Sequence, residues 1–179
     1  MKNKFLRKYE ILQSDKTKFL NFLDNFNNEM LNLKPNKDKW SLAQILFHII
    51  KGEQYTLISF LNSLKPETKL KTVRIITSIK SFFLNSALKT NFKFKAPPIV
   101  QKVPESININ ELLNKWNELR IGINKVCLNM PKDTFNKGVF KHPYIGMINL
   151  NQTLDFLIYH LKHHLKQVEK ISMSLNKIK

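Results

Sequence analysis

The stretch SLAQILFHIIKGEQYTLISFLNSL, residues 41–64, decides the fold class, because it would be apolar on nearly every side of a helix. A helix of this kind lies deep in a bundle, where other helices cover all of its faces. Its start is also marked. The hydroxyl of Ser41 can cap the helix, and Gln44 three residues later completes a capping box. The sequence therefore predicts a central helix over residues 41–64.

Three other segments have apolar residues at helical spacings of three and four, and little of the chain reads as strand. The first is 15–31, with Ser14 before it as a candidate cap. The second is 110–130, which Pro131 follows, and the third is 151–175. Four amphipathic helices predict an all-α fold, a four-helix bundle with one long crossover connection between the second and third main helices.

The crossover leaves room for a short helix over 73–89, but Pro97, Pro98 and Pro104 exclude a continuous helix beyond it. A second connection, 138–150, is predicted to be a loop. With 179 residues the chain fits a single domain, 1–179. We find no evident internal repeat.

The sequence gives no sign of secretion or of a membrane span. Residues 1–10 are charged and lack the apolar core of a signal peptide. No stretch approaches the roughly 18 consecutive apolar residues of a membrane helix. The single cysteine, Cys127, cannot form an internal disulfide. We therefore expect a cytoplasmic protein without a membrane partner.

The formal net charge of +17 raises the question of nucleic-acid binding, since basic side chains that neutralise phosphates drive such binding. Nine basic residues lie between positions 61 and 104, where Glu67 is the one acid. However, the chain has no zinc-finger spacing, no glycine-rich phosphate loop and no aromatic RNA-binding signature. A solvated basic surface is thus favoured over a nucleic-acid interface.

Three of the five histidines lie within residues 160–167. On a helix His160 and His164 are ~40° apart, whereas His163 points ~100° from His164, which predicts that His163 faces solvent or an interface. Two imidazoles at this spacing can bind Zn²⁺, and His48 is the candidate third ligand, with Gly52 leaving room one turn beyond it. The alternative is that these are neutral core histidines with satisfied N–H groups.

Two stretches carry a resemblance to a known family. Residues 39–49, Lys-Trp-Ser-Leu-Ala-Gln-Ile-Leu-Phe-His-Ile, resemble the Trp-Ser start of the second helix in the DinB-like superfamily, which includes the YfiT-type proteins. Residues 142–147, His-Pro-Tyr-Ile-Gly-Met, with Gln152 and then residues 160–167, resemble the family's last loop and helix. The two stretches lie in the order that the family has.

The resemblance implies a four-helix bundle, often a homodimer, in which three histidines hold a divalent metal ion. We expect this ion to be zinc or nickel. In this sequence the implied ligands are His48, His160 and His164. The family's assigned activities imply a metal-dependent thiol S-transferase or hydrolase that acts on a small molecule, with a low-molecular-weight thiol as a candidate partner. The alternative is a non-catalytic, stress-related protein that binds a metal, a small molecule or nucleic acid.

Four residues near the three histidines in sequence or in the quoted motifs are candidates for supporting roles. Tyr55 can hydrogen-bond a bound water or substrate, or be a core aromatic. Gln167 can orient a metal ligand from outside the coordination sphere, or be a surface amide. His142 is interpreted as fixing its loop rather than as a fourth ligand. Glu53 lies ~140° around the helix from His48, so we expect no carboxylate base there.

Two tryptophans and the cysteine complete the predictions. Trp40 and Trp116 are expected to anchor the core. Cys127 falls on the apolar side of its predicted helix and is expected to be a buried small side chain.

Overall fold

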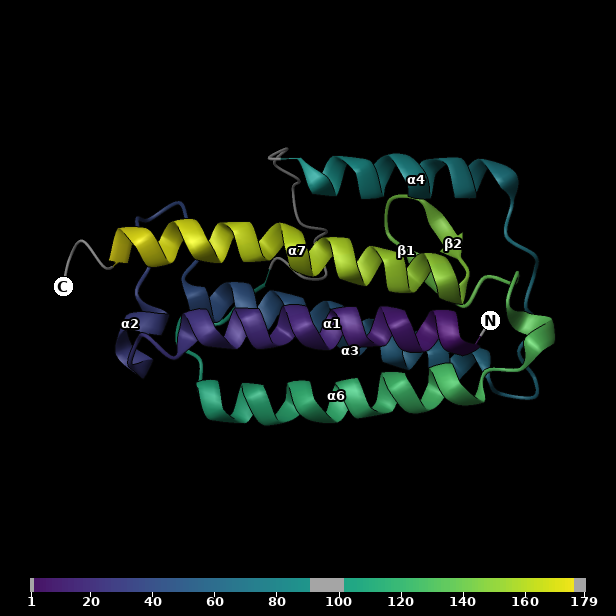
Figure 1. Cartoon of the computed structure of the whole chain (residues 1–179), viewed down its shortest axis with the longest axis horizontal. Coiled ribbons are helices and arrows are strands. Elements are labelled where there is room, and N and C mark those ends of the chain that lie inside the picture. Colours follow the sequence, from purple (N-terminus) through teal and green to yellow (C-terminus); the bar gives the residue numbers. More distant parts are fainter. Residues whose placement is uncertain (1, 91–101, 176–179) are drawn as a thin grey trace.

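Four long helices form a bundle in the computed structural model, which describes residues 2–90 and 102–175. They are α1 (Lys2–Leu23), α3 (Leu42–Ser63), α6 (Ile109–Asn129) and α7 (Leu150–Leu175). In Figure 1, α1 and α7 run in one direction and α3 and α6 in the other. The predicted all-α four-helix bundle is confirmed.

The central position of α3 explains its composition. It contacts α6, α7, the short α2 (Asn28–Asn32) and the first strand, so apolar residues are needed around the helix. Its start is as predicted: Ser41 Oγ accepts from the backbone N–H of Gln44 at 3.1 Å, and the Ser41 N–H donates to Gln44 Oε1 at 3.2 Å. The largest fully buried side chains are Trp116, Arg120, Phe19, Phe60, Leu12, Leu42, Leu46, Ile49, Ile50, Ile123, Ile148 and Leu150.

The predicted first helix, 15–31, is wrong at both ends. Helix α1 begins at Lys2 and ends at Leu23, so Ser14 lies inside the helix and caps nothing. Phe5, Leu12 and Phe19 follow one another at seven-residue spacing and are all buried, which extends the apolar stripe toward the N-terminus. A separate helix, α2, then starts with Asn27 as its cap.

The crossover between α3 and α6 holds the predicted short helix, here α4 (Ile75–Lys89). It packs along α7, on the side away from the rest of the bundle (Figure 1). Gln152 Nε2 donates to Ser78 Oγ at 2.9 Å between these two helices. Pro97 and Pro98 lie outside the described residues, whereas the Pro104 carbonyl accepts from Gln44 Nε2 at 2.9 Å.

The predicted loop 138–150 is in fact a small antiparallel hairpin. Strand β1 (Phe140–His142) pairs with β2 (Gly146–Ile148), with Phe140 opposite Ile148. Gly146 has a φ of 87°, a conformation that favours glycine. Strands of three residues are too short for an alternating pattern, so no strand could be predicted here. A 3-10 turn, η1 (Lys132–Thr134), precedes the hairpin.

No helix within residues 2–90 and 102–175 combines the length and the apolar character that crossing a bilayer requires.

Candidate metal centre

Three histidine side chains from two helices converge on one point. His48 comes from α3, and His160 and His164 come from successive turns of α7. His160 Nε2 lies 3.2 Å from His48 Nε2 and 3.1 Å from His164 Nε2. All three nitrogens lie within 4.8 Å of one another, and His48 and His164 are buried. The structure thus brings together the three side chains that the sequence singled out.

The spacing of these nitrogens fits a single divalent ion. With Zn–N bonds of about 2.0–2.1 Å, two ligand nitrogens lie about 3.3 Å apart in a tetrahedron and about 2.9 Å apart in an octahedron. The two observed separations of 3.1 and 3.2 Å fall between these values. The donor set, three imidazoles, suits zinc, nickel, copper and iron.

Gln167 fixes the protonation of one of these rings. His164 Nδ1 donates to Gln167 Oε1 at 2.9 Å, since an amide oxygen can only accept. In a neutral imidazole this leaves the lone pair on Nε2, the nitrogen that faces the other two histidines. The sequence placed Gln167 near His160, but its contact is with His164.

His163 was predicted to face solvent or an interface. The side chain is buried, so the first alternative is wrong. Gln167 Nε2 donates to His163 Nε2 at 3.2 Å, so the amide bridges two histidines. Burial lowers the pKa of His163, while hydrogen bonding to the backbones of Leu88 and Thr90 opposes this shift. The end of α4 therefore covers the face of α7 that helical geometry alone assigned to the surface.

Burial keeps the two α7 histidines of the cluster neutral. It lowers the pKa of His164 to about 3, with His48 adding to the effect. Burial, followed by the nearby His164 and His48, holds the pKa of His160 well below its ordinary value. Neutral imidazole is the form that ligates a metal, so the two α7 side chains are in the ligating form at pH 7.

Aromatic rings and a glycine surround the cluster. The rings of Trp40 and His48 have centroids 5.1 Å apart, and Phe156 stacks on His160 at 5.2 Å. Trp40 is half-buried beside the histidines, so its predicted role as a core anchor is only partly right. A Cβ added to Gly52 would lie 3.9 Å from His160 Cε1, which shows that the glycine does border the cluster.

Other candidate residues lie outside the cluster. Tyr55 is half-buried with the Lys51 ammonium 5.9 Å from its ring centre, and within the described part of the chain its hydroxyl has no hydrogen bond to the three histidines. His142 is buried on β1, where its Nδ1 accepts from the Tyr144 N–H at 3.3 Å. This contact agrees with the predicted loop-fixing role, and burial lowers the pKa of His142 to about 4.

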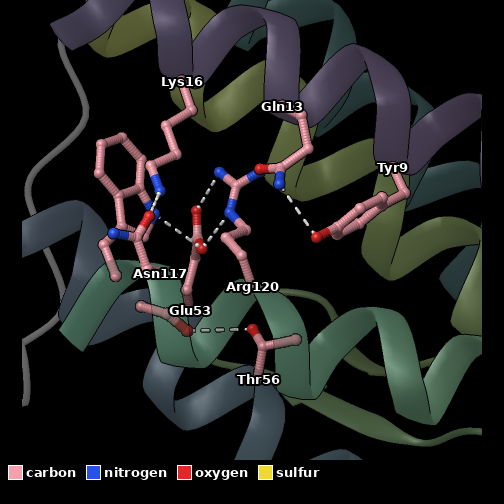
Figure 2. Close-up of polar contacts among 9 residues, drawn as sticks. Tyr9, Gln13, Lys16, Glu53, Thr56, Asn117 and Arg120 are labelled. Carbon is pink, nitrogen blue, oxygen red and sulfur yellow. Dashed lines mark hydrogen bonds and ion pairs between the residues drawn. The ribbon is translucent and has the colours of Figure 1, made fainter. Parts of the chain in front are cut away.

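The sequence did not reveal a buried ion pair between α3 and α6. Arg120 Nε and Nη2 donate to the two carboxylate oxygens of Glu53, each at 2.6 Å, and Trp116 Nε1 donates to Glu53 Oε2 at 3.0 Å (Figure 2). Lys16 of α1 hydrogen-bonds Asn117 beside them. Glu53 is thus committed to α6 and is unavailable as a base. A signal existed, because Arg120 follows Trp116 by one turn on an otherwise apolar face.

Trp116 and Cys127 lie where the sequence placed them. Trp116 is fully buried, and its ring meets that of Phe19 edge-on at 5.7 Å. Cys127 is buried, and burial raises its pKa to about 12, so its thiol is not a reactive group at neutral pH.

Comparisons with known proteins agree with this architecture. A sequence model of the DinB superfamily matches residues 12–168. The uncharacterized protein YuaE of Bacillus subtilis (strain 168) is 24% identical over 157 residues, which cover 88% of this chain and 92% of YuaE.

Among solved structures, the chain is similar to YfiT from Bacillus subtilis, described as a probable metal-dependent hydrolase with an unusual four-helix bundle topology. The TM-score is 0.63 at 16% identity, over 97% of this chain and 88% of YfiT. At this identity the likeness shows the fold alone. The superfamily match covers most of the chain, and the chain therefore belongs to the DinB superfamily.

Proposed function

We propose that this protein binds one divalent metal ion, zinc or nickel, through His48, His160 and His164. We further propose that the ion catalyses either the hydrolysis of a small molecule or the reaction of a thiol with a small electrophile, as in a thiol S-transferase. The observation that carries the proposal is the convergence of three Nε2 atoms, with neighbouring separations of 3.1 and 3.2 Å. The description of YfiT as a probable metal-dependent hydrolase adds support.

Three protein ligands are typical of catalytic rather than structural metal sites, because they leave a coordination position open. A divalent ion so held supplies Lewis acidity and lowers the pKa of a water or thiol that binds it. Gln167 orients the His164 ring for this task through its 2.9 Å hydrogen bond. Trp40 and Phe156 pack against two of the imidazoles, which restrains their rings and excludes water from their outer sides.

Within residues 2–90 and 102–175, no carboxylate joins the three histidines as a metal-binding group or as a base. Among the described residues, the group that could hold a metal consists of histidines alone, and Glu53 is held by Arg120. We therefore propose that proton transfer is left to solvent or to the thiol substrate. Tyr55 remains a proposed substrate contact on the helix that carries His48, and the homodimer stays a prediction.

The first test is metal content per chain, measured by mass spectrometry on untagged protein. We expect near-stoichiometric metal in the wild type and after His142→Asn, which removes a buried histidine outside the cluster. We expect His48→Ala and His164→Ala to lose it. Little metal in the wild type after incubation with zinc or nickel, or equal loss in His142→Asn, would reject the site.

The second test separates an enzyme from a binding protein. Metal-loaded wild type and His160→Ala would be assayed against hydrolysable small substrates and against pairs of a thiol and an electrophile. Turnover that disappears in His160→Ala supports the proposal. Stoichiometric metal without turnover in either assay would instead support the non-catalytic alternative, a metal or small-molecule carrier.

A further inference from the structure

Helix α4 exposes a row of large apolar side chains. The exposed fractions are 81% for Ile75, 48% for Ile76, 47% for Ile79, 67% for Phe82 and 65% for Phe83. Scattered exposed apolar residues are ordinary, but five on one short helix form a contiguous patch, and such patches mark interaction sites. We call these five residues the α4 apolar face.

The apolar side chains of α4 face away from the bundle, whereas those of an ordinary surface helix face the core. At about 100° per residue, the five apolar residues fall within an arc of about 120°. On the other side, Thr77, Ser81 and Leu88 are buried, and α7 is the helix against which α4 packs (Figure 1). The helix thus packs on the bundle through two small polar residues and Leu88, and turns five bulky apolar residues outward.

Basic residues border the α4 apolar face. Lys80 lies at one edge of the arc and is exposed, whereas Lys89 at the other edge has its ammonium 4.6 Å from the ring centre of Tyr159 on α7. Arg74 and Lys71, just before the helix, are exposed too. The chain has no acidic residue between Glu67 and Glu105, so no carboxylate of this segment offsets the charge.

This combination decides between two occupants. A second copy would bring the exposed Lys80, Arg74 and Lys71 against the same positive charges, and like charges brought together oppose association. An anionic lipid surface instead matches both features, since apolar side chains enter the acyl boundary while lysines meet the headgroups.

We propose that α4 docks the protein on an anionic bilayer. The helix lies in the membrane interface, and the side chains of the α4 apolar face insert into it. This goes beyond the proposed function and does not depend on the metal. It also departs from the expectation of no membrane partner, which rested on the absence of a spanning segment. A helix that lies on a membrane needs no such segment, because only one face leaves water.

The test is co-sedimentation of the full chain with vesicles of phosphatidylcholine, with or without phosphatidylglycerol. We expect wild type to bind the anionic vesicles, with weaker binding at high salt, and to stay in solution with phosphatidylcholine alone. Phe82→Ser with Phe83→Ser, and separately Lys80→Glu with Arg74→Glu, should each reduce partitioning at least about tenfold.

Two control variants on α6 make one substitution of each kind. Ile121→Ser removes an apolar side chain that is 67% exposed, and Lys115→Glu reverses an exposed charge. Both should partition like wild type, and circular dichroism should show all variants folded. If Lys115→Glu lost binding in proportion to its one reversed charge, the attraction would be diffuse, and the proposal would be overturned. The proposal would also be overturned if wild type failed to bind anionic vesicles. In that case, a dimer in solution that Phe82→Ser with Phe83→Ser dissociates would identify a second copy as the occupant of the α4 apolar face.

Discussion

The Gln167 amide contacts a different histidine with each of its two ends. Its oxygen accepts from His164 Nδ1 and its nitrogen donates to His163 Nε2, so the side chain fixes the tautomers of both rings. In turn, hydrogen bonding to the backbones of Leu88 and Thr90 raises the pKa of His163 against burial. A line of hydrogen bonds therefore leads from the end of α4 to one candidate ligand.

The first prediction is that Gln167→Leu weakens metal binding about 10–100-fold, the usual cost of losing a group that orients a ligand. The His164 ring would lose the acceptor that holds its proton on Nδ1. Metal affinity measured by competition with a chelator checks this. Gln54→Leu, which removes a half-buried amide of α3 in contact with Lys51, is the matched control and should bind like wild type. Equal affinities for Gln167→Leu and wild type would contradict the assigned role.

Two substitutions of Gly52 test helix stability and the space beside the cluster separately. An added Cβ would make an ordinary contact, 3.9 Å from His160 Cε1. Because glycine inside a helix is destabilising, Gly52→Ala should raise the free energy of unfolding by about 0.5–1 kcal/mol and keep metal affinity. Gly52→Leu should lower the affinity, since its larger side chain reaches the imidazole. Urea unfolding and chelator competition measure the two effects, and a destabilised Gly52→Ala would contradict the geometry.

Between helices, the Glu53–Arg120 pair is a buried polar link. Both side chains are nearly inaccessible, at 2% and 1% exposure, and Trp116 adds a third donor to the carboxylate. Removing one partner of such a pair leaves a buried charge uncompensated. The pair joins α3 to α6 with two parallel hydrogen bonds of 2.6 Å (Figure 2).

We predict that Glu53→Gln lowers the free energy of unfolding by about 3–5 kcal/mol, because Arg120 stays buried without its counter-charge. Urea denaturation measures this loss. Adding Arg120→Met should recover much of it, since neither charge then remains. As a control, Lys137→Met breaks the exposed pair with Asp133 and should leave the urea midpoint nearly unchanged. A Glu53→Gln midpoint equal to that of the control would show that the pair contributes little.

How far the elements could be predicted depended on the strength of their periodic pattern. The helices α3, α6 and α7 each have an apolar face with spacings of three and four, and their ends were predicted to within one residue. The start of α1 was missed because charged residues separate Phe5 from Leu12 and hide the stripe. The hairpin was missed because three residues per strand carry no period.

The candidate site was predictable in part for a similar reason. The i, i+4 spacing places His160 and His164 on one face of α7, while His48 was one candidate partner from its helix position, which the family resemblance then supported. The position of His163 could not be predicted, because helical geometry gives a direction but not which element lies there. That depends on the path of the crossover, which brings α4 onto α7. Likewise, the position of Arg120 on the apolar face of α6 does not reveal its partner, because Glu53 comes from α3.

For the folded chain as a unit, buried neutral histidines make stability depend on pH. Burial lowers the pKa of His142 from 6.5 to about 4, so below 6.5 the unfolded chain takes up the proton first. The contribution is fully present above pH 6.5 and is lost as the pH falls through this range toward 4. For His142 alone the loss amounts to about 3 kcal/mol, and the shifts of His164 and His160 act in the same direction.

The last prediction is that metal-free protein loses stability steeply between pH 6.5 and about 4, and that His142→Asn makes the dependence shallower by about one proton. The free energy of unfolding would be measured in urea at several pH values, with chelator present because bound metal would compete with protons for the imidazoles. Lys141→Asn, an exposed neighbour on β1, is the matched control and should keep the wild-type slope. If His142→Asn and wild type lose stability in parallel, then His142 takes up its proton alike in both states, and its burial on β1 does not suppress ionisation.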